Sequence, residues 1–133
     1  MGVKRIYFMK KLSRLRAITG IELNPNCADS GLHIVHGKIV VHLNAKIGKD
    51  CKILSDVTIG WQGRYDKPSA PQIGDRVFIG SGAKIIGNIT IASDVVIGAN
   101  AVVVHSINEP GITVAGNPAK KVSDTDSYYL NKE

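Results

Sequence analysis

An aliphatic residue recurs at every sixth position through most of the chain. One run begins at Ile73 and ends at Val103, and a second run in the same frame begins at Val35 and ends at Ile59. The residue four places later is small or aliphatic in most repeats: Ala45, Cys51, Val57, Val77, Ala83, Val95 and Ala101. A period of six fits the 3.6-residue helical period poorly but is a multiple of the two-residue strand period. The pattern therefore predicts short strands joined by corners.

A fixed repeat of this length predicts a parallel β-helix in which three hexads form one coil of a triangular prism. The aliphatic residue of each hexad points inward and stacks on its equivalents in neighbouring coils. Gly48, Gly74 and Gly80 directly follow aliphatic residues and ease the backbone through the bend. Because each coil buries its inner face only against the next coil, both ends need covers. We expect these covers within residues 1–19 and 123–133.

The repeat is interrupted once, just before Ile73, where the step is eight residues longer than one hexad. The inserted residues include the only tryptophan, Trp61, together with Gln62, Arg64 and Tyr65. A loop that leaves an otherwise regular wall is usually functional. The simpler alternative is a neutral surface insertion.

The composition bounds the class of protein. With 133 residues the chain forms one domain, and its 14 glycines and 5% aromatic residues suit strands and tight corners. No apolar stretch approaches the roughly 20 residues that span a bilayer, and the apolar run at residues 6–9 is too short for a secretory signal. Cys27 and Cys51 suit a reducing compartment, so we expect a cytoplasmic protein without a disulfide.

The formal charge of +6 is concentrated in residues 1–16, which contain six basic residues and no acid. In the rest of the chain bases and acids balance, so the folded face lacks the basic stripe that nucleic-acid binding requires. Residues 1–16 can form a short helix with Phe8, Leu12 and Leu15 on one side. We favour a cap on the open end of the prism. Adsorption to an anionic membrane surface is the alternative.

The hexad frame, the looped-out hexad and the closing phrase VAGNPAKKV (residues 114–122) together resemble the left-handed β-helix acyltransferases. The nearest branch contains serine acetyltransferase and relatives that O-acetylate bacterial polysaccharide precursors, and the similarity covers about residues 21–122. The resemblance implies an all-β, left-handed parallel β-helix, a homotrimer with sites in grooves between subunits, acetyl-coenzyme A as donor, and no metal. We therefore divide the chain into a basic helical cap (1–20), the β-helix (21–122) and a tail (123–133).

In this family a histidine on the wall acts as general base. The phrase GLHIVHGKIVVHLNAKIG (residues 31–48) resembles the segment that carries it, and the match falls on His36 rather than on His33 or His42. Because His36 follows Val35, which the frame places inward, we expect His36 to point outward toward a neighbouring subunit. A hydroxyl attacks a thioester faster when a base removes its proton in the same step, which is typically worth ~10²–10⁴ in rate.

The serine branch also has an upstream carboxylate that orients this histidine. Glu22 falls at about that place if one residue is allowed as a gap. A Glu–His pair would hold the ring in its useful tautomer and stabilise the cation that forms during proton transfer. We therefore predict His36 and Glu22 as the catalytic pair.

In this family the donor is bound mostly through the backbone of the coils, where small residues allow close approach. The positions that match are Gly60, Ser81, Gly82 and Ala99. Lys120 and Lys121, which follow the closing GNP, are expected to meet the nucleotide phosphates as point charges. The alternative is that the small residues serve only the corners.

Two departures from the serine branch bear on the acceptor. An acid precedes the catalytic histidine in that branch, where this chain has Val35, and an Arg-His pair stands where this chain has Ser69-Ala70. Those groups engage the amino acid, so we favour a sugar or glycan hydroxyl as acceptor. We expect it to approach from the loop, where it would contact Trp61, Gln62, Arg64 and Tyr65. Trp61 could equally pack against the neighbouring subunit.

Three other functions remain open. The nearest is serine O-acetyltransferase, which differs only in the acceptor. A zinc enzyme resembling the γ-class carbonic anhydrases shares the fold but needs three converging histidines, and the spacing of His36, His42 and His105 does not suit one ion. The third is a β-helix scaffold without chemistry.

Overall fold

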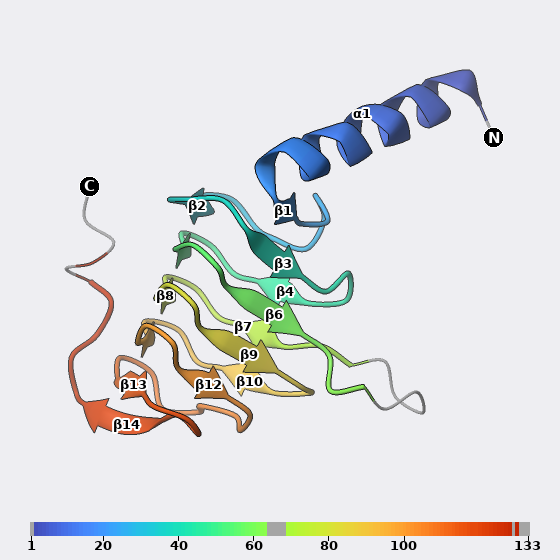
Figure 1. The fold of residues 1–133 in the computed structure, drawn as a ribbon. Coiled ribbons are helices and arrows are strands. Elements are labelled where there is room, and N and C mark those ends of the chain that lie inside the picture. Colours follow the sequence, from blue (N-terminus) through green and yellow to red (C-terminus); the bar gives the residue numbers. More distant parts are fainter. Residues whose placement is uncertain (1, 64–68, 129, 131–133) are drawn as a thin grey trace.

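The computed structural model describes residues 2–63, 69–128 and 130, which form one helix and a parallel β-helix (Figure 1). Helix α1 spans Val3–Thr19, and the chain then winds through three sheets that form the walls of a prism. The predicted strand-and-corner fold with a short N-terminal helix is confirmed. Two residues of the predicted acceptor loop, Arg64 and Tyr65, lie outside the described residues.

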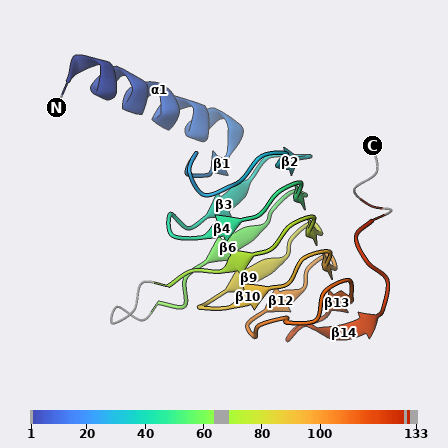
Figure 2. The same ribbon diagram turned by 180° about the vertical axis from the view of Figure 1, so that it is seen from behind.

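The three middle coils contribute one strand to each wall, whereas the first and last coils meet sheet B only through isolated bridges; Figure 2 shows the same stack from behind. Sheet A contains β1 (Ile21–Glu22), β3 (Ile39–Val41), β6 (Thr58–Gly60), β9 (Lys84–Ile86) and β12 (Val102–Val103). Sheet B contains β4 (Lys46–Ile47), β7 (Gln72–Ile73) and β10 (Thr90–Ile91). Sheet C contains β2 (His33–Ile34), β5 (Lys52–Ile53), β8 (Phe78–Ile79), β11 (Val96–Ile97), β13 (Thr113–Ala115) and β14 (Lys120–Ser123). The pairs are parallel except for β13 with β14.

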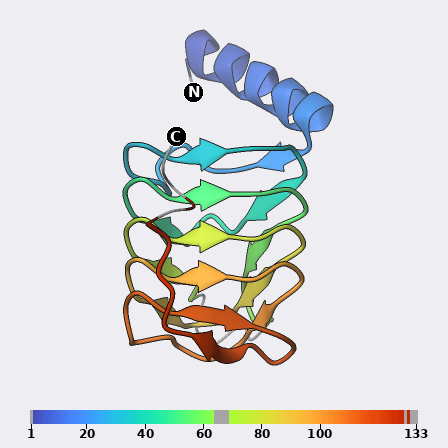
Figure 3. The ribbon, with the colours of Figure 1, turned by 90° about the vertical axis from the view of Figure 1, so that its left-hand side faces the viewer.

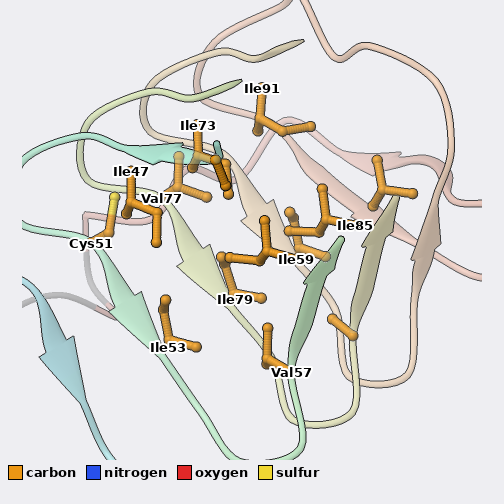
Figure 4. Packing of buried hydrophobic residues seen from close by; sticks show 14 of the residues in the cluster. Ile47, Cys51, Ile53, Val57, Ile59, Ile73, Val77, Ile79, Ile85 and Ile91 are labelled. Carbon is orange, nitrogen blue, oxygen red and sulfur yellow. The ribbon is translucent and has the colours of Figure 1, made fainter. Parts of the chain in front are cut away.

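The core is the stack of inward aliphatic residues that the hexad frame predicts (Figure 4). From Val41 to Val103 every aliphatic residue of the frame is at most 7% exposed. Equivalent residues lie opposite one another in neighbouring coils, as Ile79 does with Ile53 and Ile97. Both cysteines are buried and free, as expected, and burial raises the pKa of Cys51 to about 11.

The frame differs from the prediction in the first coil. Ile34 lies opposite Ile53, whereas Val41 lies opposite Ile59, so the first coil has one extra residue between these two strands. The prediction that Val35 points inward is therefore wrong. Ile34 packs against the core, and the N–H of Val35 donates to the carbonyl of Ile53. The extra residue is absorbed in the corner that carries His36.

Two edges of the prism are built from left-handed turns. The C–A edge, where sheet C turns into sheet A, has positive φ at Lys38, Asp56, Gly82 and Asn100. The B–C edge, where sheet B turns into sheet C, has positive φ at Gly31, Asp50, Arg76, Asp94 and Gly111. Gly, Asn and Asp tolerate this conformation best, which explains most of these residue types. Similar turns in successive coils keep the corners aligned along the prism.

Different chain segments lie at the two ends of the prism. At the C-terminal end, β14 folds back on β13, and the following residues run along the B–C edge (Figure 3). There the N–H of Ser127 donates to the carbonyl of Asp94, and Lys52 Nζ donates to the carbonyl of Leu130. At the other end, α1 buries none of its residues. Within the described residues no helix is both long enough and apolar enough to cross a membrane.

Candidate functional site

His36 is exposed in the corner between β2 and β3, on the C–A edge. The corners above it in the stack contain three of the predicted donor-binding residues, Ser81, Gly82 and Ala99. Backbone hydrogen bonds hold these corners together, with Gly82 N donating to Ser55 O at 2.8 Å and Asn100 N donating to Ser81 O at 2.8 Å. The structure therefore brings the predicted base and most of the predicted donor wall onto one edge.

The small residues of this edge also serve the corners themselves. Gly82 has φ +76°, and a Cβ at that position would collide with the carboxamide of Asn100. At Gly80 a Cβ would lie 2.6 Å from the backbone nitrogen of Ala99. Both glycines are therefore required by the turn whether or not a ligand lies beside them. The more informative positions are Ser81, which is half-buried, and Ala99, which is exposed on the same edge.

The loop predicted to bind the acceptor leaves the prism at a different edge, where sheet A turns into sheet B. Gly60 ends β6 there, and the ring of Trp61 lies 6.3 Å from the ring of His42 with an interplanar angle of 39°. The N–H of Asn44 donates to His42 Nδ1, so the proton of a neutral His42 ring is on Nε2. Gln62 is exposed beside these residues.

Sheet A separates His36 from Trp61 and Gly60 within one protomer. His36 lies where the chain enters this sheet, and Trp61 lies where the chain leaves it. The residue predicted to act as base and the residues predicted to bind the acceptor therefore lie at opposite edges of sheet A.

The predicted orienting carboxylate lies in the first coil with His36. Glu22 is exposed on β1, opposite Val40 of β3, which is the strand that directly follows the His36 corner. In the described part of the chain no side-chain hydrogen bond joins Glu22 to His36. The role of Glu22 in orienting His36 stays a prediction, to be tested by activity measurements.

The two lysines of β14 differ in their surroundings. Lys121 Nζ lies 2.7 Å from Glu109 Oε1 and 2.6 Å from Asp124 Oδ1. Hydrogen bonds to Asp124 and Glu109 raise the pKa of Lys121. Its charge is thus balanced by two carboxylates, whereas Lys120 is exposed on the neighbouring position. Of the two predicted phosphate contacts, Lys120 is the better placed.

One of the two positions at which the resemblance predicts contact with the acceptor is closed to a ligand. Ala70 is only 2% exposed and belongs to the apolar core, whereas Ser69 is half-buried beside it. The sequence showed that the Arg-His pair is absent, but only the fold shows that Ala70 faces inward. Among residues 2–63, 69–128 and 130 no group of three or more His, Cys, Asp or Glu side chains is placed to hold a metal ion.

Comparisons with known proteins agree with this architecture. The Hexapep family, described as bacterial transferase hexapeptide (six repeats), matches residues 70–105. Serine acetyltransferase of Helicobacter pylori (strain ATCC 700392 / 26695) is 41% identical over 124 residues, covering 90% of this chain and 72% of the relative. The chain belongs to the serine acetyltransferase-like branch of the left-handed β-helix acyltransferases.

Solved structures of this branch superpose on the chain. Serine acetyltransferase from Brucella abortus strain S19, in complex with coenzyme A, has a TM-score of 0.78 and 35% identity over 85% of this chain. Soybean serine acetyltransferase complexed with serine has a TM-score of 0.75 and 37% identity over 83% of this chain. The chain spans 46% of the length of each of these two proteins, so they share its β-helix and extend well beyond it.

The six-residue pattern did not single out Gly37, the residue that shapes the His36 corner. Gly37 lies directly under the end of α1, where a Cβ would be 2.6 Å from the carbonyl oxygen of Thr19. The N–H of Ile39 donates to the carbonyl of Gly20 at 3.0 Å in the same place. The sequence did contain a signal for this contact: a glycine directly follows the candidate base, and glycine often stands where another segment of backbone comes close.

We expect Gly37→Ala to lower kcat/KM for acetyl transfer by at least tenfold. The added methyl group pushes the corner away from Thr19, and a displacement of about 1 Å at a catalytic group can cost roughly 10²-fold. Gly2→Ala is the matched control, because nothing lies within 4 Å of a Cβ at that position. Steady-state kinetics and thermal melting of both variants are the measurements. An unchanged kcat/KM in Gly37→Ala would show that the corner adjusts without moving His36.

Proposed function

We propose that this chain is an acetyl-coenzyme A-dependent O-acetyltransferase and that its acceptor is the hydroxyl of L-serine. The observation that carries the proposal is 41% identity over 90% of the chain to a serine acetyltransferase. The solved relatives include one complex with coenzyme A and one with serine. Our sequence-based preference for a sugar hydroxyl and polysaccharide biosynthesis finds no support in these relatives. Serine, the alternative there, fits them better.

In this proposal His36 removes the proton of the acceptor hydroxyl while the hydroxyl oxygen attacks the thioester carbonyl carbon. The tetrahedral intermediate then collapses, the carbon–sulfur bond breaks, and the imidazolium returns its proton to the departing thiolate. The products are the O-acetyl ester and free coenzyme A, so no oxidant, metal or further co-reactant is needed. General-base assistance of this kind is typically worth ~10²–10⁴ in rate. Glu22 acts as a positioning residue for the ring.

The donor is proposed to lie along the C–A edge, because Ser81 and Ala99 continue the line of His36 along that edge. The exposed ammonium of Lys120 would meet the phosphates. The acceptor is proposed to enter from the edge at Trp61, which belongs to a neighbouring protomer. A closed trimer supplies three equivalent pairs of such edges, so we propose a homotrimer as the active assembly.

A sugar or glycan hydroxyl is the second candidate. Ala70 faces the core and Val35 stands where the branch has an acid, so this chain lacks groups that bind an amino acid in its relatives. The half-buried indole of Trp61, at the edge where the loop leaves the prism, offers an aromatic surface for a sugar ring.

A thiol-release assay separates the two candidates. Purified protein is given acetyl-coenzyme A with L-serine, or with a panel of hexoses, amino sugars and nucleotide sugars, and free thiol is measured. We expect L-serine to give the highest kcat/KM. Release with a sugar and not with serine would favour the second candidate. If none of the hydroxyl compounds in the panel gives thiol release, although circular dichroism shows the folded β-helix, the proposal is overturned.

A further inference from the structure

Helix α1 exposes apolar side chains around most of its surface, and one of its sides combines three of them with three cations that nothing else in the described structure covers. Its side toward the prism carries Leu12 and Arg16, which are half-buried, and Arg16 Nη2 donates to the carbonyl of Leu23 at 3.3 Å. None of the 17 helix residues is buried, and Figure 1 shows the helix extending away from the first coil. The helix therefore does not cover the end of the prism as the predicted cap would.

The side of α1 opposite Leu12 and Arg16 forms a continuous surface, which we name the docking face. It lines a hollow of about 540 Å³ and consists of Tyr7, Lys10, Lys11, Arg14, Leu15 and Ile18. Tyr7 is 70% exposed, Leu15 48% and Ile18 71%. Three cations are interleaved with three large apolar side chains at spacings of three and four residues, so they share one side of the helix.

We propose that the docking face adsorbs to the surface of an anionic phospholipid bilayer. The chain through Thr19 carries six basic residues and no acidic one, and the whole formal excess of +6 lies there. An anionic surface attracts such a segment, while Tyr7, Leu15 and Ile18 enter the headgroup region. Long Lys and Arg side chains reach outward past neighbouring apolar groups to the phosphates.

Two other occupants fit the docking face less well. A second α1 would bring two clusters of six cations together without any acid to pair with them, which is repulsive. A nucleic acid would neutralise the cations but would leave Tyr7, Leu15 and Ile18 without an apolar environment. A lipid surface satisfies both features. A 17-residue helix without buried residues is only marginally stable in water, and contact with a lipid surface would stabilise it.

The test is vesicle co-sedimentation of the full chain. Vesicles of phosphatidylcholine alone and of phosphatidylcholine with phosphatidylglycerol are compared at low and at physiological ionic strength. We expect binding only to the anionic vesicles, weakening as salt increases. In Lys10→Glu/Lys11→Glu the partition coefficient should fall by at least ~25-fold, because each cation near an anionic surface contributes roughly fivefold.

The matched control is Lys46→Glu/Lys49→Glu, which changes the net charge equally but on exposed positions of the prism. It should bind vesicles nearly as wild type does, and both double variants should retain acetyl transfer. Tyr7→Ser/Ile18→Ser, which keeps every charge, should also weaken binding to anionic vesicles. Equal loss in both charge variants would indicate attraction by net charge alone and would overturn the docking face. So would wild-type protein that binds a single-stranded oligonucleotide but no vesicles, or that self-associates through α1.

Discussion

Replacing His36 by alanine is expected to lower kcat for acetyl transfer by ~10²–10⁴, the usual contribution of a general base. The side chain is exposed in its corner, so its loss creates no cavity and should leave the melting temperature nearly unchanged. Thiol release with saturating acetyl-coenzyme A and L-serine is the measurement.

The control for this variant is His33→Ala. His33 lies in the same coil, is also exposed, and belongs to β2 on the outer side of sheet C. Its removal should change kcat less than twofold. If the two variants retain equal activity, His36 is not the base, and His42, the histidine beside Trp61, becomes the next residue to test.

Replacing Ile79 by alanine is expected to reduce the free energy of unfolding by roughly 2–5 kcal/mol, the range found for removing large aliphatic side chains from a core. Ile79 is fully buried in β8, in the middle of sheet C, with Ile53 and Ile97 directly opposite it. Because the coils stack tightly, the neighbouring side chains cannot collapse into the space without moving the walls. Urea unfolding at one fixed protomer concentration measures the effect.

Two variants complete this experiment. Ile79→Val should cost only about 0.5–1.5 kcal/mol, since it removes one methyl group. Val104→Ala changes a side chain that is 39% exposed and should lie within about 0.5 kcal/mol of wild type. A cost below about 1 kcal/mol for Ile79→Ala would contradict the stacked-coil account of stability.

The hexad period predicted most of the fold because each coil repeats the same local problem. An aliphatic residue at Ile53, Ile79 or Ile97 must point inward, and the next coil provides the only apolar partner. The frame failed at Val35, where the first coil is one residue longer than the next. A single-residue shift reverses which side chain faces inward, and the local sequence at Ile34-Val35 offers two aliphatic residues that satisfy the pattern equally.

The candidate site was only partly accessible from the sequence. The resemblance pointed to His36 as the base and to Ser81 and Ala99 as donor contacts, and the fold places these three residues on one edge. The sequence did not show that Trp61 leaves from another edge, or that Lys121 is already paired with Glu109. Those facts depend on where corners meet in space and on contacts between residues at least ten apart along the chain.

The sequence by itself determined the architecture, because a six-residue period with aliphatic and small positions suits stacked strands and corners rather than helices, and its quoted motifs pointed to the family. Only the tertiary structure decided that sheet A separates His36 from Trp61, and that α1 packs on the first coil near Arg16 and otherwise extends away from it. The physical reason is that periodicity specifies which way a side chain points within a coil. How edges, ends and helices lie relative to one another depends on corner lengths and on packing between distant segments.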